Sequence, residues 1–185
     1  MVFLVTVNKE GVVHLKLTTQ RLNILALSGE EVGLLAADLA SFQTKLGLVY
    51  KGEAIIGHLL EVTKQQAKAI AADNKNVMWN TFWLFVLKEE NTAIGSACFK
   101  GAPDASGAVE IGYGTNELFQ NKGYTSEAIG ALCRWAFTQP GVKTVLAETD
   151  KSNTASHRVL EKNGFEVYRQ TADCLWWQVS APCIK

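Results

Sequence analysis

The stretch from residue 107 to residue 137 has the residue types and spacing of an anion-binding turn. An apolar segment at 108–113 (Ala-Val-Glu-Ile-Gly-Tyr) is followed by Gln-Asn-Lys-Gly-Tyr-Thr at 120–125, where a helix is predicted to begin. A helix that opens in a glycine-bearing turn presents unpaired backbone N–H groups to one point, and its dipole adds positive potential there. The pattern therefore predicts a site for a phosphate or pyrophosphate group.

Two glycines in the preceding segment, Gly112 and Gly114, narrow the choice of ligand. Glycine inside a strand often marks a bulge or the close approach of a ligand. A splayed strand with free N–H and C=O groups can pair with an extended amide-bearing ligand as it would with another strand. Coenzyme A has both a pyrophosphate and a diamide arm. A plain strand–helix turn is the alternative for this segment taken alone.

A second group of residues lies at 153–165, Asn-Thr-Ala-Ser-His-Arg-Val-Leu-Glu-Lys-Asn-Gly-Phe. Asn153 suits a helix N-cap, and Gly164 suits the left-handed position after a helix. Val159 and Leu160 suit the apolar face between them. On its own this segment predicts a short amphipathic helix and nothing more.

Bulk composition limits the class of protein. The 185 residues are 48% hydrophobic and 19% charged, which is typical of one globular domain. Eighteen basic residues balance eighteen acidic ones, which argues against nucleic acid or an anionic membrane as the main partner. Neither a signal peptide nor an apolar run long enough to span a membrane is recognised, so we expect a cytoplasmic protein.

The four cysteines do not have the spacing of a metal site or a disulfide framework. They are Cys98, Cys133, Cys174 and Cys183, without a CxxC pair or histidines at ligand distance. We therefore expect no metal cofactor, and we expect Cys98 and Cys133 to be buried free thiols.

Hydrophobic periodicity then predicts the elements that must hold these groups. Strands are expected at 3–7, 12–17 and 21–25, with a turn at 8–11, and residues 1–17 read as an N-terminal strand extension of one domain spanning 1–185. One helix is predicted from 28 to 46, opened by a Ser-x-x-Glu capping box and closed by Gly47, and a second is carried by apolar residues from 55 to 70. Residues 82–87 read as a strand buried on both faces, and it is followed by strands at 93–99 and around 111.

The C-terminal third alternates between helix and strand. Helices are predicted at 123–138 and 153–163, with strands at 144–148, through Phe165 and through 176–177. The whole order predicts an α/β fold with a mixed, mostly antiparallel sheet packed by helices.

At this spacing the two constellations together resemble the GNAT superfamily of N-acetyltransferases, most closely the branch that contains ribosomal-protein N-terminal acetyltransferases and aminoglycoside acetyltransferases. The strings that carry the resemblance lie at 109–113, 120–128 and 153–165, within a likeness extending over about 21–177. The resemblance implies an acyl-coenzyme A N-acyltransferase fold, in which acetyl-coenzyme A binds between two splayed parallel strands. It also implies an acetyl-coenzyme A co-substrate and an amine acceptor, and leaves open whether the protein is a homodimer.

The resemblance carries functional residues onto this chain. The pyrophosphate loop maps onto 120–125, the pantetheine-pairing strand end maps onto 113–115, and Asn153 matches a position that contacts the coenzyme arm. The implied coenzyme-binding residues are Tyr113, Gly114, Thr115, Gln120, Asn121, Lys122, Gly123, Tyr124, Thr125 and Asn153.

The sequence departs from the family pattern at two positions. Thr125 stands where glycine or alanine is usual, and Leu160 stands where many members have a tyrosine that protonates the leaving thiolate. Leucine cannot donate a proton, so Ser156, which matches a serine proposed for that role in some members, is the candidate acid. A helix-cap role explains Ser156 equally well.

The chemistry also requires a neutral amine. An alkylamine of pKa ~10.4 is neutral in about one molecule in 2,500 at pH 7, and a peptide α-amine of pKa ~8 in about one in ten. A general base therefore matters most for alkylamines. Glu110 is the first candidate and Glu148 the second, and a solvated or ion-paired carboxylate is the alternative for each.

These residues predict an N-acetyltransferase that moves the acetyl group of acetyl-coenzyme A to a primary amine, by direct attack in a ternary complex. The acceptor is a protein N-terminus or a small-molecule amine. A non-catalytic acyl-coenzyme A sensor on the same fold is the alternative, and Leu160 is the feature that supports it. A phosphotransferase is disfavoured because the chain has no Gly-x-x-x-x-Gly-Lys-Ser/Thr loop.

Overall fold

A mixed β-sheet runs the length of the molecule in this computed structural model, which describes residues 2–7, 13–73 and 75–181. The described strands follow the order β1-β2-β3-β5-β6-β7-β8-β10-β9, and the short β4 pairs with β6. Their bounds are β1 (Val2–Val7), β2 (Val13–Thr18), β3 (Leu22–Ala26), β4 (Val49–Tyr50), β5 (Phe82–Leu87), β6 (Thr92–Phe99), β7 (Ala108–Thr115), β8 (Thr144–Asp150), β9 (Glu166–Gln170) and β10 (Cys174–Ser180). Pairing is antiparallel except for β4 with β6 and β7 with β8.

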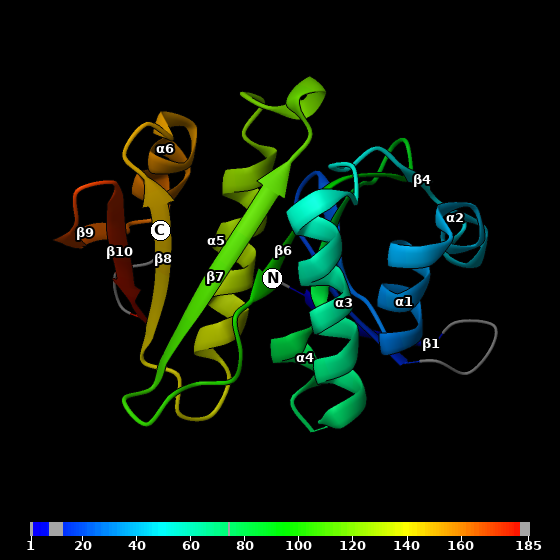
Figure 1. The fold of residues 1–185 in the computed structure, drawn as a ribbon, viewed down its shortest axis with the longest axis horizontal. Coiled ribbons are helices and arrows are strands. Elements are labelled where there is room, and N and C mark those ends of the chain that lie inside the picture. Colours follow the sequence, from blue (N-terminus) through cyan, green and yellow to red (C-terminus); the bar gives the residue numbers. More distant parts are fainter. Residues whose placement is uncertain (1, 8–12, 74, 182–185) are drawn as a thin grey trace.

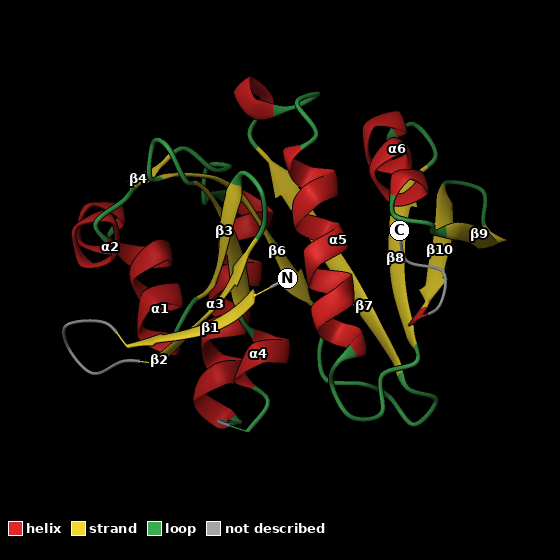
Figure 2. Cartoon of the chain, turned by 180° about the vertical axis from the view of Figure 1, so that it is seen from behind, coloured by secondary structure: helices red, strands yellow, loops and turns green. Residues whose placement is uncertain are grey.

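The helices form a layer on each face of this sheet. Those in the described part are α1 (Gly29–Ala37), α2 (Leu39–Leu46), α3 (Gly57–Ala72), α4 (Val77–Asn80), α5 (Tyr124–Phe137) and α6 (Thr154–Lys162), with a 3-10 turn η1 (Glu117–Phe119). The segment from α1 to α4 covers the half of the sheet around β5 and β6 on the side seen in Figure 1. Figure 2 shows α5 and α6 on the opposite side, across β7 and β8.

The central strand β5 divides the hydrophobic core in two. All six of its residues are buried. Phe82, Leu84 and Val86 pack with α1, α2 and α3 residues, whereas Trp83 and Phe85 pack with the α5 side. Alternate side chains of a strand point to opposite faces, so β5 supplies both layers at once. The predicted burial of this strand on both faces is confirmed.

The single helix predicted for residues 28–46 is in fact two helices. The capping box is present, because the Ser28 hydroxyl accepts a hydrogen bond from the Glu31 N–H and the Glu31 carboxylate accepts one from the Ser28 N–H. Asp38, however, has φ −149° and ψ 88°, which ends α1, and its side chain then caps α2 by accepting from the Ser41 N–H. An aspartate in the middle of an apolar period favours a cap over a helix interior.

The remaining predicted elements are observed with small changes at their ends. β8 continues to Asp150, two residues beyond its predicted end, and β9 begins after Phe165, whose side chain is buried. The three shortest elements, β4, η1 and α4, were not predicted. The turn expected at 8–11 lies outside the described residues. The mixed α/β sheet flanked by helices is confirmed.

Candidate functional site

The two parallel strands β7 and β8 separate at the centre of the sheet. They pair at three positions, Ala108 with Thr144, Val109 with Val145 and Glu110 with Leu146. Beyond that point β7 continues to Thr115 and β8 to Asp150 with no mutual pairing. The edge of β7 that faces β8 therefore presents backbone groups to a gap, as the sequence predicted for a strand-like ligand.

The loop that follows β7 returns to the gap and delivers the start of α5. The Gln120 side-chain amide donates to the Thr115 carbonyl over 2.9 Å, which ties the loop to the end of β7. Asn121 and Gly123 both have positive φ, 59° and 79°. No side chain caps α5, so the N–H groups of its first turn are available to an external acceptor. This is the geometry of an anion site at a helix N-terminus.

Thr125, which departs from the family pattern, causes no strain at its position. It lies within α5, in helical backbone, and its hydroxyl is 2.9 Å from the hydroxyl of Thr115 on β7. The threonine therefore adds a contact between the helix start and the strand end.

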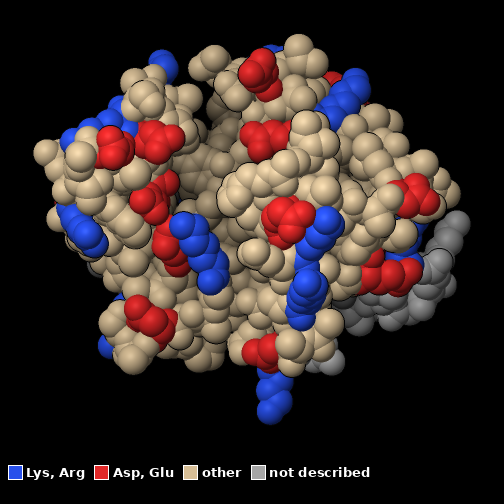
Figure 3. All heavy atoms as spheres, in the orientation of Figure 1, with Lys and Arg blue, Asp and Glu red and all other residues tan. Residues whose placement is uncertain are grey.

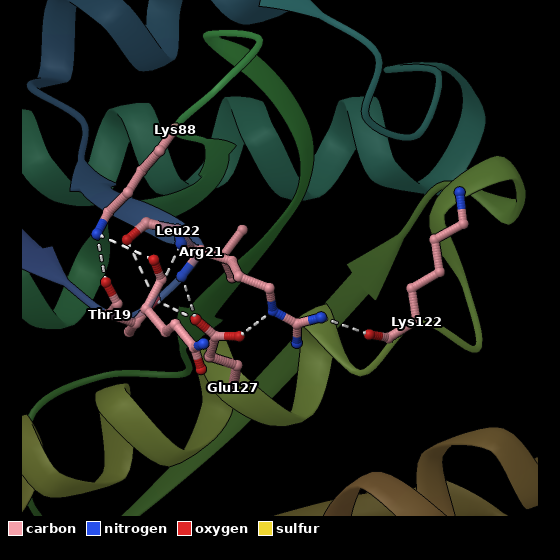
Figure 4. Close-up of polar contacts among 7 residues, drawn as sticks. Thr19, Arg21, Leu22, Lys88, Lys122 and Glu127 are labelled. Carbon is pink, nitrogen blue, oxygen red and sulfur yellow. Dashed lines mark hydrogen bonds and ion pairs between the residues drawn. The ribbon is translucent and has the colours of Figure 1, made fainter.

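Arg21, just before β3, braces the same loop from a distant part of the chain. Its Nε donates to Glu127 Oε2 over 2.7 Å, and one terminal nitrogen donates to the Lys122 carbonyl over 2.9 Å. Its guanidinium also lies 4.6 Å from the centre of the Tyr124 ring. Figure 4 shows the contacts of Arg21 with Glu127 and Lys122 converging between the N-terminal strands and the start of α5.

Glu127 is the centre of this brace. Oε1 accepts from the Thr19 hydroxyl over 2.6 Å and from the Arg21 backbone N–H over 2.8 Å. Burial alone would raise the pKa of Glu127, but the hydrogen bonds from Thr19 and Arg21, with the Arg21 charge, hold that pKa below its ordinary value of 4.5. Lys88 extends the network by donating to the Gln20 carbonyl over 3.3 Å. The negative charge of Glu127, in the first turn of α5, is thus compensated by the positive charge of Arg21.

The helix α6 forms the other wall of the gap. Asn153 caps it, because its side-chain oxygen accepts from the Ser156 N–H over 3.1 Å. Tyr113 on β7 donates its phenol hydrogen to the Ser156 carbonyl over 3.3 Å, and burial raises the pKa of Tyr113, so the phenol stays protonated as a donor. Arg158 and Lys162, one turn apart, bring two positive charges to the same wall.

These elements enclose a cleft of about 470 Å³. The described residues that line it are Glu53, Tyr113, Gly114, Thr115, Gln120, Asn121, Gly123, Thr125, Ser126, Asn153, Ala155, Ser156, Arg158, Val159 and Lys162. Eight of the ten predicted coenzyme-binding residues and the predicted acid Ser156 are among them. Lys122 and Tyr124 are not, because the Lys122 ammonium lies 5.5 Å from the centre of the Phe119 ring and Tyr124 lies beside Arg21.

The two predicted bases lie outside this lining. Glu110 forms an ion pair with Lys100 of β6, and its side chain is 21% exposed. Glu148 is exposed on β8 beside Cys174, whose pKa is raised first by a hydrogen bond to Glu148 and further by burial and the neighbouring carboxylates. Leu160, at the position of the usual tyrosine, is fully buried in the core next to α5.

Sequence reasoning missed several residues of the cleft, and Glu53 is the most consequential. It lies in the loop between β4 and α3, and it is the one carboxylate among the described residues that line the cleft. No motif surrounds Glu53; only the pairing of β4 with β6 brings its loop to the end of β7. On the face drawn in Figure 3 the molecule is hollowed between flanking acidic side chains.

The three cysteines among the described residues, Cys98, Cys133 and Cys174, are free thiols. Cys133 is buried, which raises its pKa to about 12, and Cys98 is half-buried with a raised pKa for the same reason. Cys183 lies outside the described residues. Among the described residues no cluster of His, Cys, Asp or Glu side chains could hold a metal ion. No helix in the described ranges is long and apolar enough to cross a membrane.

Comparison with known proteins identifies the family. Residues 37–166 match the acetyltransferase (GNAT) domain, and the chain therefore belongs to that family. A relative described as the uncharacterized N-acetyltransferase YjdG of Bacillus subtilis is 35% identical over 95 residues, which is 51% of this chain and 56% of the relative. The match thus spans little more than half the length of that relative.

Two solved structures extend the comparison to the fold. RimL, a ribosomal L7/L12 α-N-protein acetyltransferase, superposes with a TM-score of 0.67 at 14% identity, covering 96% of this chain and 99% of RimL. The N-acetyltransferase PseH of Campylobacter jejuni, solved with acetyl-coenzyme A, gives a TM-score of 0.55 at 17% identity, covering 86% and 98%. These likenesses confirm the predicted acyltransferase fold. The family match agrees with the resemblance to the GNAT superfamily that the sequence indicated.

Proposed function

We propose that the protein transfers the acetyl group of acetyl-coenzyme A to a primary amine by direct attack in a ternary complex. The observation that carries this proposal is the cleft itself, which joins the uncapped start of α5 to the unpaired edge of β7. One end of this cleft suits a pyrophosphate, and the other suits an extended diamide arm. Membership of the GNAT family supports the same co-substrate.

The residues of the cleft divide into parts for each segment of the coenzyme. The backbone N–H groups from Lys122 to Thr125 would bind the pyrophosphate, with Gln120 and Asn121 shaping the loop. Arg158 and Lys162 would add charge-assisted contacts to its phosphates. Residues 113–115 would pair with the diamide arm, and Asn153 would contact that arm from α6.

The transfer step then needs three groups near the thioester. The amine nitrogen attacks the carbonyl carbon, and backbone N–H groups near Tyr113 and Gly114 stabilise the oxyanion that forms. As the intermediate collapses, the C–S bond breaks and its electron pair goes to sulfur, which takes a proton. We assign that proton to the Ser156 hydroxyl, because Ser156 lines the cleft and Leu160 does not.

A base must first convert the ammonium ion into the neutral amine. Glu110 and Glu148 are the candidates by position, since each lies on a strand that borders the gap. The ion pair with Lys100 restrains the Glu110 carboxylate. The acceptor is proposed to be a protein N-terminus or a small-molecule amine. RimL, which shares the fold, is described as a protein α-N-acetyltransferase, which supports the first of these.

Calorimetric titration with acetyl-coenzyme A, followed by an amine panel read by release of the thiol, tests the proposal. Suitable probes are an alanine-initiated peptide without lysine and 1,5-diaminopentane. No binding at about 1 mM coenzyme would exclude the proposed co-substrate. Binding without turnover of any acceptor would favour the alternative, a non-catalytic acyl-coenzyme A sensor.

Ser156→Ala separates the acid from the cap. The cap uses the Ser156 backbone N–H and the Asn153 side chain, so alanine keeps it. We expect kcat to fall by about tenfold or more with the coenzyme Kd unchanged, because general acid catalysis contributes at least that much when it operates. An unchanged kcat would show that Ser156 serves only the helix.

A further inference from the structure

The loop between β4 and α3 delivers Glu53 to the strand on which the thioester is proposed to lie. Lys51 donates its backbone N–H to the Ala93 carbonyl over 2.7 Å, and the Asn116 side chain donates to the Gly52 carbonyl over 3.3 Å. Tyr50 donates its hydroxyl to the Glu53 carbonyl over 3.0 Å. The backbone of this loop is therefore tied both to β6 and to the end of β7.

The side chain of Glu53 lies directly on Gly114. A methyl group built on Gly114 would be 2.5 Å from Glu53 Oε2 and 2.6 Å from Oε1, so only glycine leaves room for the carboxylate there. Gly112, two residues earlier on the same face of β7, has open space at the corresponding point. The contact with Gly114 is thus a local feature of the strand end, next to the proposed site of acetyl transfer.

The state of Glu53 differs from that of the other carboxylates near the gap. Glu127 accepts hydrogen bonds from Thr19 and Arg21, and Glu110 is paired with Lys100. The Glu53 carboxylate has neither a hydrogen bond nor an ion pair with any described residue. Its charge acts on Tyr50, where burial and then this charge raise the pKa of the phenol. A solvent-accessible carboxylate without a partner can accept a cation and its proton.

The geometry points to Glu53 as the group that receives the acceptor amine as an ammonium ion and removes its proton. This inference rests on the proposed acetyl transfer and names the chemical class of acceptor: a primary amine that arrives protonated. The ammonium ion gives one proton to the Glu53 carboxylate, and the freed lone pair attacks the thioester carbon. The second proton leaves the nitrogen as the amide forms and balances the one taken up by the departing thiolate.

Glu53→Gln gives the assignment a pH signature that a structural role would not produce. With a base present, an ammonium substrate reacts, so kcat/KM changes little between about pH 6 and the pKa of the amine. Without one, only the neutral amine reacts, and kcat/KM rises about tenfold per pH unit over that range. For 1,5-diaminopentane we expect Glu53→Gln to lower kcat/KM by about 2,500-fold at pH 7, the ratio of ammonium ion to neutral amine, with convergence toward the wild-type value near the pKa of the amine.

The lysine-free alanine-initiated peptide provides an internal comparison. Its α-amine has a pKa of ~8, so the two enzymes should converge above about pH 8, earlier than with the diamine. Glu53→Asp should restore part of the flat profile. Glu61→Gln is the matched control, because Glu61 is an exposed α3 carboxylate paired with Lys64, and it should behave as wild type.

The outcomes separate this inference from the proposed function. If the wild-type protein acetylates neither probe, the acetyl transfer and the role of Glu53 fall together. If the wild-type protein is active and Glu53→Gln keeps its pH profile, only the role of Glu53 is overturned. A steep profile in Glu110→Gln with a flat one in Glu53→Gln would give that role to Glu110. The Kd for acetyl-coenzyme A is measured for each variant. A lower rate supports the role of Glu53 only if this Kd is unchanged.

Discussion

The start of α5, called the coenzyme end below, and the loop that carries Glu53, called the acceptor end, both line one cleft, but they are held in different ways. Around α5, Glu127 and the Lys122 carbonyl are fixed by side chains from the N-terminal strands, about a hundred positions away in the sequence. Around Glu53, hydrogen bonds hold the backbone of the loop and leave its carboxylate without a partner among the described residues. The coenzyme end is therefore preorganised, and the acceptor end keeps a reactive group available.

This difference follows from what each end is proposed to do. A pyrophosphate is the same in every turnover, so a rigid set of N–H groups loses little entropy when it binds. An acceptor must exchange a proton with the protein, so a fully satisfied carboxylate would be a poor partner for it. Variants at each end should consequently fail in different ways, in binding at one end and in rate at the other.

The largest expected effect is the loss of coenzyme binding in Gly123→Glu. Gly123 has φ +79°, which a side chain tolerates poorly, and glutamate would place a negative charge beside the proposed pyrophosphate. We expect acetyl-coenzyme A affinity to fall by about 100-fold or more in calorimetry. Gly141→Glu is the matched control, since Gly141 has φ +84° and open space outside the cleft. Equal affinities in the two variants would show that the loop is only a turn.

Removal of the brace should weaken the same end to a smaller extent. Arg21→Ala deletes the contacts to Glu127 and to the Lys122 carbonyl, and it leaves an uncompensated carboxylate in the first turn of α5. Because Arg21 is partly exposed, we expect about a tenfold rise in the coenzyme Kd.

A double-mutant cycle separates the brace from a direct contact between Arg21 and phosphate. If Arg21 acts through Glu127, Arg21→Ala should cost much less affinity in a Glu127→Gln background. Equal losses in both backgrounds would contradict the bracing role and favour direct binding of the phosphate by Arg21.

Sequence reasoning identified more of the cleft lining near the start of α5 than near Glu53, and the reason is physical. The coenzyme end is made mainly of the backbone of a strand, a turn and a helix start. Such local geometry favours particular residue types, such as glycine at position 123 and the helix cap Asn153, so it can be recognised in the sequence. The contacts of Arg21 with Glu127 and Lys122 could not be predicted from a local pattern, because these partners lie about a hundred residues further along the chain. The helix break at Asp38 could have been anticipated, since aspartate favours caps over helix interiors.

The acceptor end could not be predicted because tertiary contacts create it. Glu53 follows a two-residue strand whose pairing with β6 no periodicity reveals, and it reaches the cleft only through that pairing. Glu110 and Glu148 were chosen because they lie on the right strands. The position of a carboxylate on a strand does not predict its side-chain contacts, such as the ion pair between Glu110 and Lys100.

Gly114→Ala tests the contact between Gly114 and the Glu53 carboxylate by adding one methyl group at position 114. Its Cβ would displace the Glu53 carboxylate, and that flexible side-chain end can move at little cost to stability. We expect kcat to fall by about fivefold, well below the ~100-fold or more that a general base contributes, because the carboxylate is displaced and not removed. The change in the coenzyme Kd should be smaller. Gly112→Ala is the control, because the added methyl group meets open space two residues away on the same face. Equal rates in the two variants would contradict the importance of the Glu53–Gly114 contact.

The smallest effect is expected in the acid stability of the brace. The pKa of Glu127 is lowered in the folded protein, so its ionised form stabilises the fold above its ordinary pKa of 4.5, and this stabilisation is lost as the pH falls through the lowered value. At neutral pH, Glu127→Gln should reduce the free energy of unfolding by about 1–2 kcal/mol, the cost of weakening hydrogen bonds to a charged group. The gap between variant and wild type should narrow below about pH 4 in denaturant titrations. A gap that stays constant down to about pH 3 would contradict this account of the brace.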